Sequence, residues 1–233
     1  MNILITGAGR GLGLQLTMLA AKRGNQVVVC VREVSDTSEG LWALAARHPD
    51  QVRIESMNVT LENEVAELAD KLSKESAKLD GVINNAGVLL GREHKIGTLP
   101  MNLLKSTFDV NLYGPMNVMK HMSSLMSDHS GANVINISSE AGSMASGYGG
   151  DYPYAISKTA LNMFSKQLND ELRPRGIRVL SVHPGWIRTD MGGDQAPMEA
   201  SESASGILDL MERKTVVDEE LFFVDYSGRA MPV

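Results

Sequence analysis

Short runs rich in Val and Ile recur along the chain and alternate with stretches of helical periodicity. The runs are typical of buried parallel strands and lie at 2–5, 26–31, 51–57, 81–83, 133–137 and 177–182. The stretches between them predict helices at 14–23, 39–48, 61–78, 101–128 and 152–173. Parallel neighbours in a sheet need crossover helices. The pattern therefore predicts an α/β fold, a doubly wound parallel sheet with helices on both faces.

The longest predicted helices carry identifiable start and break signals. Apolar side chains at Val65, Leu68, Ala69 and Leu72 form one helical stripe in 61–78, and Thr60 is the expected N-cap. Pro115 lies inside 101–128 and should kink or locally unwind that helix. We expect about seven strands in a single Rossmann-like domain that spans residues 1–233.

A glycine-rich turn separates the first strand from the first helix. It reads Thr6-Gly7-Ala8-Gly9-Arg10-Gly11-Leu12-Gly13. The spacing fits neither G-x-G-x-x-G, since Leu occupies positions 12 and 14, nor a P-loop, since no Gly-Lys-Ser/Thr follows. Glycines allow close backbone approach, and a helix N-terminus attracts a pyrophosphate. The alternative is a turn that serves packing alone, which four glycines in seven residues disfavour.

The second strand ends at Arg32, where a dinucleotide-binding fold selects its cofactor. An acid there would bind the ribose 2′-hydroxyl of NAD, whereas an arginine suits the 2′-phosphate of NADP. Arg10 adds a second positive charge from the turn. These residues favour NADP(H), with NAD(H) as the alternative because Glu33 follows directly. Arg32 could also be a solvated loop charge.

The composition argues against nucleic-acid-binding, zinc-binding and membrane-spanning proteins. A net charge of −6 argues against a broad nucleic-acid surface. Five histidines show no metal-binding spacing, and one cysteine, Cys30, makes a zinc site improbable. No apolar run suggests a membrane span, and the first strand begins at residue 2, without room for a signal peptide. We expect a cytoplasmic protein without metal.

Tyr154 and Lys158 begin the helix after the fifth strand and share one helical face. A neighbouring ammonium stabilises a phenolate and would lower the tyrosine pKa, which makes Tyr154 a usable general acid or base. Without context such a pair could be an exposed surface pair. The context is a sheet whose strand ends meet at one edge, which is where ligands bind in this fold.

Several motifs together resemble the short-chain dehydrogenase/reductase family over nearly the whole chain. They are Thr6-Gly7-x-x-x-Gly11-x-Gly13, Asn84-Asn85-Ala86-Gly87, Asn111, Ser138-Ser139, Tyr154-x-x-x-Lys158 and Pro184-Gly185 with Thr189. The segments 183–191 and 222–228 look most like the C-factor and sniffer-type carbonyl reductase branch.

The resemblance implies an NADP(H)-dependent oxidoreductase that acts on a small carbonyl or alcohol. The implied catalytic residues are Asn111, Ser139, Tyr154 and Lys158. Tyr154 would exchange the proton, Lys158 would hold the nicotinamide ribose and Ser139 would orient the substrate oxygen. Asn111 would fix a water that links Lys158 to solvent. The implied cofactor residues are Gly7, Gly9, Arg10, Gly11, Leu12, Gly13, Arg32, Asn58, Val59, Asn85, Ala86, Gly87, Tyr154, Lys158, Pro184, Gly185, Ile187 and Thr189.

Two departures from the family pattern concern the ligand site. Asn58 stands where the family has an adenine-binding Asp, and its carbonyl oxygen would accept from the adenine amino group. Ser139 and Tyr154 are farther apart in sequence than is usual, which should reshape the substrate entrance. Apolar side chains there predict an apolar substrate pocket, namely Met144, Tyr148, Tyr152, Trp186 and Met191.

Three further expectations concern the substrate loop, the assembly and His183. Residues 186–215 would form a substrate loop. The helices that begin at Met101 and Tyr152 would pair in a homodimer or homotetramer. His183, which precedes Pro184, is expected to be structural. The competing hypothesis is a non-catalytic nucleotide-binding signalling or scaffold protein on the same fold, which fold alone cannot exclude.

Overall fold

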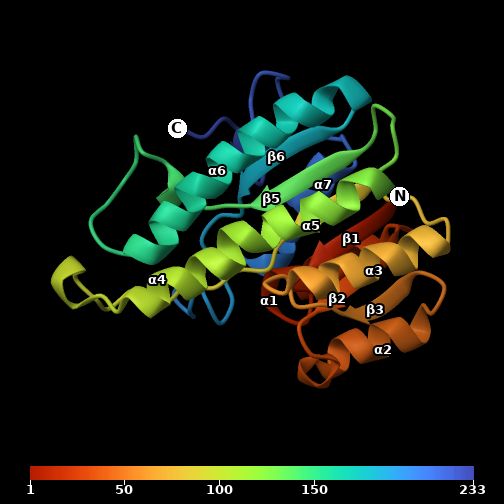
Figure 1. Ribbon diagram of the computed structural model, residues 1–233, viewed down its shortest axis with the longest axis horizontal. Helices are drawn as coiled ribbons and strands as arrows, with labels where there is room; N and C mark the ends of the chain where they lie inside the picture. The colour runs from red at the N-terminus through yellow and green to blue at the C-terminus, as the bar shows by residue number, and fades with distance from the viewer.

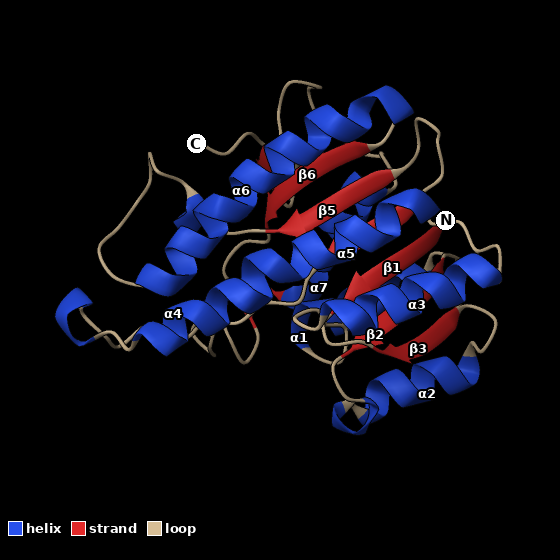
Figure 2. Cartoon of the chain, viewed as in Figure 1, coloured by secondary structure: helices blue, strands red, loops and turns tan.

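A seven-stranded, entirely parallel sheet forms the centre of the molecule in the computed structural model, which describes residues 1–233 apart from the side chain of Asp36 (Figure 2). The strand order is β3-β2-β1-β4-β5-β6-β9. The strands are β1 (Asn2–Thr6), β2 (Gln26–Val31), β3 (Val52–Ser56), β4 (Gly81–Asn84), β5 (Asn133–Ile137), β6 (Arg178–His183) and β9 (Phe223–Asp225). The predicted doubly wound sheet is confirmed.

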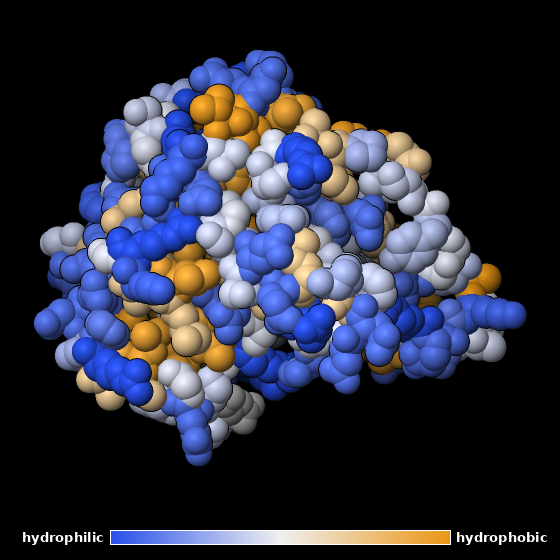
Figure 3. Space-filling view, turned by 180° about the vertical axis from the view of Figure 1, so that it is seen from behind, coloured by the Kyte–Doolittle hydropathy of each residue, from blue (hydrophilic) through white to orange (hydrophobic). Residues whose placement is uncertain are grey.

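Helices cover both faces of this sheet. Figure 1 shows α3 (Glu62–Lys74), α4 (Met101–Phe108), α5 (Gly114–Met122) and α6 (Tyr152–Leu172) in front of the strands. Behind them lie α1 (Gly11–Lys22) and α7 (Ala200–Met211), and α2 (Glu39–Arg47) lies beside β3 at the edge. Seen from behind, hydrophilic side chains surround separate apolar patches (Figure 3).

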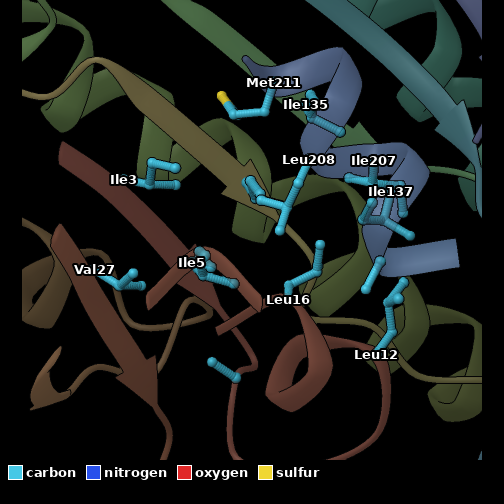
Figure 4. Packing of buried hydrophobic residues seen from close by; sticks show 14 of the residues in the cluster. Ile3, Ile5, Leu12, Leu16, Val27, Ile135, Ile137, Ile207, Leu208 and Met211 are labelled. Carbon is cyan, nitrogen blue, oxygen red and sulfur yellow. The ribbon is translucent and has the colours of Figure 1, made fainter. Parts of the chain in front are cut away.

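The core consists of two apolar layers, one on each side of the sheet. Ile3 and Ile5 of β1 face the layer that contains Leu16 of α1 and Leu208 of α7 (Figure 4). Leu4 points the other way, into the layer beneath α3, α5 and α6. Burial of each such side chain contributes about 1.5–3 kcal/mol. The period-two alternation along β1 thus anchors helices on both faces and holds the strand ends in place.

The predicted helix over 101–128 is interrupted by a π-helical segment, Asp109–Tyr113, between α4 and α5. The residues at its two ends, Phe108, Asp109, Tyr113 and Gly114, have right-handed helical backbone angles, so the helical path continues from α4 into α5. Pro115 follows at the start of α5 and has no N–H for the α-helical bond to the carbonyl of Asn111. The expected local unwinding is present, and it is centred on Asn111.

Two local expectations were wrong. Thr60 does not cap α3: its N–H and hydroxyl donate to Oδ1 of Asn58, while the Glu64 carboxylate accepts from the N–H of Asn58. Residues 186–215 are not a single loop either. They contain the short strands β7 (Ile187–Arg188) and β8 (Met198–Glu199), followed by α7. Ala204, Ile207, Leu208 and Met211 are fully buried, so α7 belongs to the core.

Candidate active site

Strand order reverses at β1, which pairs with β2 on one side and β4 on the other. Connections leave this point toward opposite faces of the sheet, and a crevice opens at the carboxyl ends of the strands. There the structure has a cleft of about 1160 Å³. It is lined by every predicted cofactor residue and by Ser139. Of the predicted site residues, only Asn111 does not line it.

The glycine turn is fastened to the end of β4. The Thr6 hydroxyl accepts hydrogen bonds from the N–H groups of Asn85 and Ala86, at 3.0 and 3.1 Å. The Asn85 side-chain amide donates back to the carbonyls of Thr6 and Gly7, at 2.9 and 3.0 Å. These four bonds fix the turn against the neighbouring strand end.

Close approach explains two of the glycines. Gly7 has φ +64°, and a Cβ there would lie 2.7 Å from Cα of Ala86. A Cβ at Gly13 would lie 2.4 Å from the Gly7 carbonyl oxygen. The first turn of α1 therefore lies directly on the glycine turn. Its free N–H groups and positive dipole end face the cleft, an arrangement that fits a pyrophosphate.

Charged side chains stand around this end of the cleft. Arg10 lines it and donates a 3.1 Å hydrogen bond to Asp190, on the segment after β7. Arg32 and Glu33 line it from the end of β2. Asn58 lines it as well, but its Oδ1 already accepts two hydrogen bonds from Thr60. The adenine-binding role of Asn58 stays a prediction.

Three predicted catalytic side chains meet at the other end of the cleft. The Ser139 hydroxyl lies close enough to the Tyr154 hydroxyl to lower the pKa of the phenol. Lys158, one helical turn farther along α6, lies with its Nζ 5.5 Å from the centre of the Tyr154 ring. That Nζ donates a 2.7 Å hydrogen bond to the carbonyl of Ile137, the last residue of β5. Serine, tyrosine and lysine are thus assembled as the sequence predicted.

The pKa values of Tyr154 and Lys158 are both shifted by burial, and that of Tyr154 moves in the direction opposite to the prediction. Burial raises the pKa of Tyr154 to about 12, against a smaller lowering by the Ser139 hydroxyl. Burial also lowers the pKa of Lys158, whose side chain is almost fully enclosed, to about 8. The prediction of a Tyr154 pKa below its usual value was wrong for the protein alone. Loss of solvation dominates, because both groups must give up water to reach this position.

Asn111 is fully buried in the π-helical segment. Its side chain accepts from the N–H of Val88 and donates to the Val88 carbonyl, both at 2.9 Å, and to the Ser157 hydroxyl at 3.0 Å. A Cβ placed on Gly87 would lie 3.5 Å from Asn111 Oδ1 and 3.8 Å from Lys158 Nζ. Asn111 therefore lies behind the cleft wall, next to Lys158.

The sequence did not predict a buried cluster of hydrogen bonds beneath the predicted catalytic groups, which we call the polar clamp. Oδ1 of Asn162, on α6, accepts hydrogen bonds from Ser138 at 2.6 Å and from Ser181 at 2.5 Å. Its Nδ2 donates to the Gly142 carbonyl at 3.2 Å. A Cβ on Gly142 would lie 2.8 Å from the Lys158 backbone, so the turn Glu140–Gly142 packs directly on α6. The i+4 spacing from Lys158 to Asn162 was the signal available in the sequence.

The apolar side chains predicted to form a substrate pocket line the cleft only in part. Tyr148, Trp186 and Met191 line it, but Met144 and Tyr152 do not, and Met144 is 79% exposed. The pocket was therefore predicted only in part. Polar residues that the prediction did not include also line it, among them Arg92, Ser106, Asp109, Glu140 and His183.

His183 has the structural role expected of it. Its Nδ1 accepts a 3.2 Å hydrogen bond from the N–H of Glu140, and burial lowers the pKa of its imidazole. The neutral ring therefore supports the turn that follows Ser139.

Two kinds of feature are absent from the residues that the structure describes. No group of three His, Cys, Asp or Glu side chains there is arranged to hold a metal ion. No described helix is both long and apolar enough to cross a membrane. The cytoplasmic location stays a prediction.

The sequence matches known proteins over most of its length. The pattern of the short chain dehydrogenase family matches residues 1–200. The chain is 36% identical to C-signal of Myxococcus xanthus over 155 residues, which are 66% of this chain and 92% of that protein.

Solved structures show the same fold. A short-chain dehydrogenase/reductase from Burkholderia multivorans with bound NADP superposes with a TM-score of 0.88 at 29% identity, over 100% of this chain and 99% of that one. The carbonyl reductase Sniffer of D. melanogaster superposes with a TM-score of 0.87 at 28% identity, with the same coverage. Family pattern, sheet topology and the Ser139, Tyr154 and Lys158 cluster agree: the chain belongs to the short-chain dehydrogenase/reductase family, with carbonyl reductases among its structural neighbours.

Proposed function

We propose that this oxidoreductase transfers hydride between NADP(H) and a small carbonyl or alcohol, with Tyr154 as the general acid or base. The observation that carries the proposal is the Ser139–Tyr154 hydroxyl pair, in one cleft with Lys158 and the glycine turn. A bound nicotinamide supplies the hydride chemistry. The side chains of this protein supply position, proton and charge stabilisation.

Tyr154 and Ser139 act on the substrate oxygen. Two hydroxyl donors that converge on one point stabilise the negative charge that develops on a carbonyl oxygen during reduction. The raised pKa of Tyr154 keeps its phenol protonated at neutral pH, which suits a proton donor. The Lys158 ammonium then stabilises the phenolate, and its lowered pKa of about 8 allows it to return a proton to Tyr154. Asn111 supports a water that links Lys158 to solvent.

The remaining predicted residues hold the cofactor. The glycine turn and the start of α1 bind the pyrophosphate. Arg10 and Arg32 bind the 2′-phosphate, and this pair supports NADP(H) over NAD(H), as does the NADP-bound Burkholderia neighbour. Asn58, Val59 and 85–87 border the adenosine, and Pro184, Gly185, Ile187 and Thr189 border the nicotinamide.

The predicted bounds of the substrate loop change, whereas the single domain is kept. We propose that residues 1–233 act as one cofactor-binding domain and that the substrate loop comprises 186–199. The loop ends where α7 begins, because α7 is buried against α1.

The test is NADPH consumption with a panel of small aldehydes and ketones, by wild-type protein and by Tyr154→Phe. Loss of the hydroxyl removes the proton donor and should lower kcat by about 100- to 10,000-fold. NADPH binding, measured by fluorescence titration, serves as the control and should be retained, because the ring of Tyr154 and the other cofactor residues are unchanged. Equal rates in the two proteins would remove Tyr154 from the mechanism.

A nucleotide-binding signalling protein is the second candidate, favoured by the similarity to C-signal. The complete set of proton-transfer groups supports the enzyme, because a protein that only senses a nucleotide has no use for them. NADPH binding without turnover of any carbonyl would favour the second candidate.

Assembly is also a proposal. Exposed apolar side chains on α4, α5, α6 and the π-helical segment support pairing of these helices in a homodimer or homotetramer, namely Met101, Tyr113, Met116, Ile156 and Met163. Light scattering after gel filtration gives the mass, and a monomer at micromolar concentration would contradict the proposal.

A further inference from the structure

Arg92 brings a guanidinium into the cleft next to the catalytic tyrosine. It belongs to the segment between β4 and α4, and it lines the cleft together with Tyr148, Ser139 and Tyr154. Its side chain is 59% exposed, so solvent and ligands can reach the charged group. No family motif found in the sequence includes this residue.

The buried carboxylate of Asp151 binds Arg92 through Nε alone. Nε donates to both carboxylate oxygens of Asp151, at 3.1 and 3.2 Å. The Asp151 side chain is 7% exposed and also accepts a 3.2 Å hydrogen bond from the Tyr148 hydroxyl. The two Nη groups of Arg92 have no hydrogen-bond partner among the residues that the structure describes. A fixed guanidinium therefore presents donors to the cleft.

The position of Arg92 is tied to that of Tyr154. Asp151 is the residue that precedes α6, and its carbonyl accepts from the N–H of Ala155 at 2.8 Å. Tyr154 lies in that same first turn. The charges also influence each other, because Arg92 lowers the pKa of Tyr154 and Tyr154 raises that of Arg92.

Other charged residues line the cleft at its two ends and on its walls. Arg10 and Arg32 lie at the glycine turn and at the end of β2, and Lys158 is enclosed beside Tyr154. Glu140 and Asp109 place carboxylates on the walls. An anionic group near Tyr154 would be repelled by these carboxylates and attracted by Arg92. The partner charge of Arg92 is Asp151, which is buried and offers little surface to a ligand.

We propose that the substrate carries a carboxylate, which the Nη groups of Arg92 bind while Ser139 and Tyr154 engage the carbonyl oxygen. A planar carboxylate matches two parallel N–H donors of a guanidinium. This inference rests on the proposed function and names its substrate class, an oxo acid or the corresponding hydroxy acid.

The experiment compares carboxylated aldehydes with their neutral methyl esters. The probes are 3- and 4-carboxybenzaldehyde and the two methyl esters, with NADPH as reductant. Wild-type protein should prefer an acid over its ester in kcat/KM. Arg92→Gln should lower that acid-to-ester ratio by about 10- to 100-fold, mainly through KM, because a charge-assisted hydrogen bond is lost. Arg92→Lys should be intermediate, since it keeps the charge and loses the fork.

Lys166→Gln is the matched control. Lys166 is an exposed cation on α6 that pairs with Asp170 and does not line the cleft, so its removal should leave the ratio as in wild type. A wild-type protein without preference for either acid would overturn the inference. So would an Arg92→Gln variant in which acid and ester decline equally.

A binding measurement separates this inference from the proposed function. Benzoate has no carbonyl to reduce, and its binding to the NADPH complex can be followed by calorimetry. Benzoate binding to wild type that is lost in Arg92→Gln would support the carboxylate site even if no aldehyde is reduced. Ester reduction that depends on Tyr154, without benzoate binding or acid preference, would retain the function and overturn the carboxylate site.

Discussion

The Ser138 hydroxyl donates a 2.6 Å hydrogen bond to Oδ1 of Asn162, and this contact joins the end of β5 to α6. Asn162 lies about two helical turns after Tyr154. The same side chain contacts Ser181 on β6 and the carbonyl of Gly142. Four segments therefore meet at one amide, and we expect the spacing between Ser139 and Tyr154 to depend on it.

Asn162→Ala should lower both stability and kcat. Two buried serine hydroxyls would lose their acceptor, which should cost about 1–3 kcal/mol in the free energy of unfolding. The Ser139 hydroxyl lowers the pKa of Tyr154, so a looser pair should move the alkaline limb of the pH–rate profile upward. Urea denaturation and a pH–rate series would measure these effects.

Ser181→Ala is the control for Asn162→Ala. It removes one hydrogen bond of the clamp on the side away from Ser139. We expect a smaller loss of stability and an unshifted pH profile. A shift of the profile in neither variant would show that the clamp does not position the catalytic pair.

Lys158→Met should abolish activity and stabilise the protein at neutral pH. Burial lowers the Lys158 pKa from 10.5 to about 8, so protonated Lys158 destabilises the folded state. Such a shift corresponds to about 3 kcal/mol, from which loss of the hydrogen bond to Ile137 subtracts about 1 kcal/mol. The expected gain at pH 7 is therefore about 2 kcal/mol in urea denaturation.

The stability that Lys158→Met gains over wild type should depend on pH. The cost is fully present below the folded pKa of about 8 and disappears as the pH rises above 10.5, where the lysine is neutral in both states. The advantage of Lys158→Met should therefore shrink between pH 8 and pH 10.5. Lys166→Met, at an exposed position, should show no such trend. A destabilised Lys158→Met at pH 7 would contradict the desolvation argument.

Arg32→Asp should weaken NADPH binding far more than NADH binding. A charge-assisted contact to the 2′-phosphate would be replaced by repulsion, which we expect to change the NADPH-to-NADH ratio of kcat/KM by about 10- to 100-fold. Arg47→Asp, on the exposed face of α2, is the matched control. Equal losses with both cofactors would exclude Arg32 from phosphate binding.

Gly13→Ala should disrupt the cofactor seat. The new methyl group would lie 2.4 Å from the Gly7 carbonyl oxygen and 2.5 Å from Nδ2 of Asn85, so α1 or the turn must move. Overpacking of this kind costs about 1–3 kcal/mol, and NADPH affinity should fall with the displaced turn. Gly97→Ala is the control, because a Cβ there meets no atom within 4 Å. Unchanged NADPH affinity in Gly13→Ala would contradict the tight contact.

Much of the site was predictable because its signals are local in sequence. The glycine turn, the Asn84–Gly87 break, Ser139 and the Tyr154–Lys158 pair lie at strand ends, and parallel topology brings strand ends together. Helix α7 was not predicted, although Ala204, Ile207, Leu208 and Met211 follow a helical stripe, because the prediction assigns residues 186–215 to a substrate loop.

The amino-acid sequence by itself determined the alternation of strands and helices, the glycine turn and which side chains are candidates for catalysis. Those depend on periodicity and short spacing. Only the tertiary structure decided the direction of the Tyr154 pKa, because desolvation depends on what the whole chain packs around the phenol. It alone brought Arg92 to Asp151 and Asn162 to Ser138, pairs that are 59 and 24 residues apart. Contacts between residues so distant in the chain leave no local pattern and arise only when the sheet assembles.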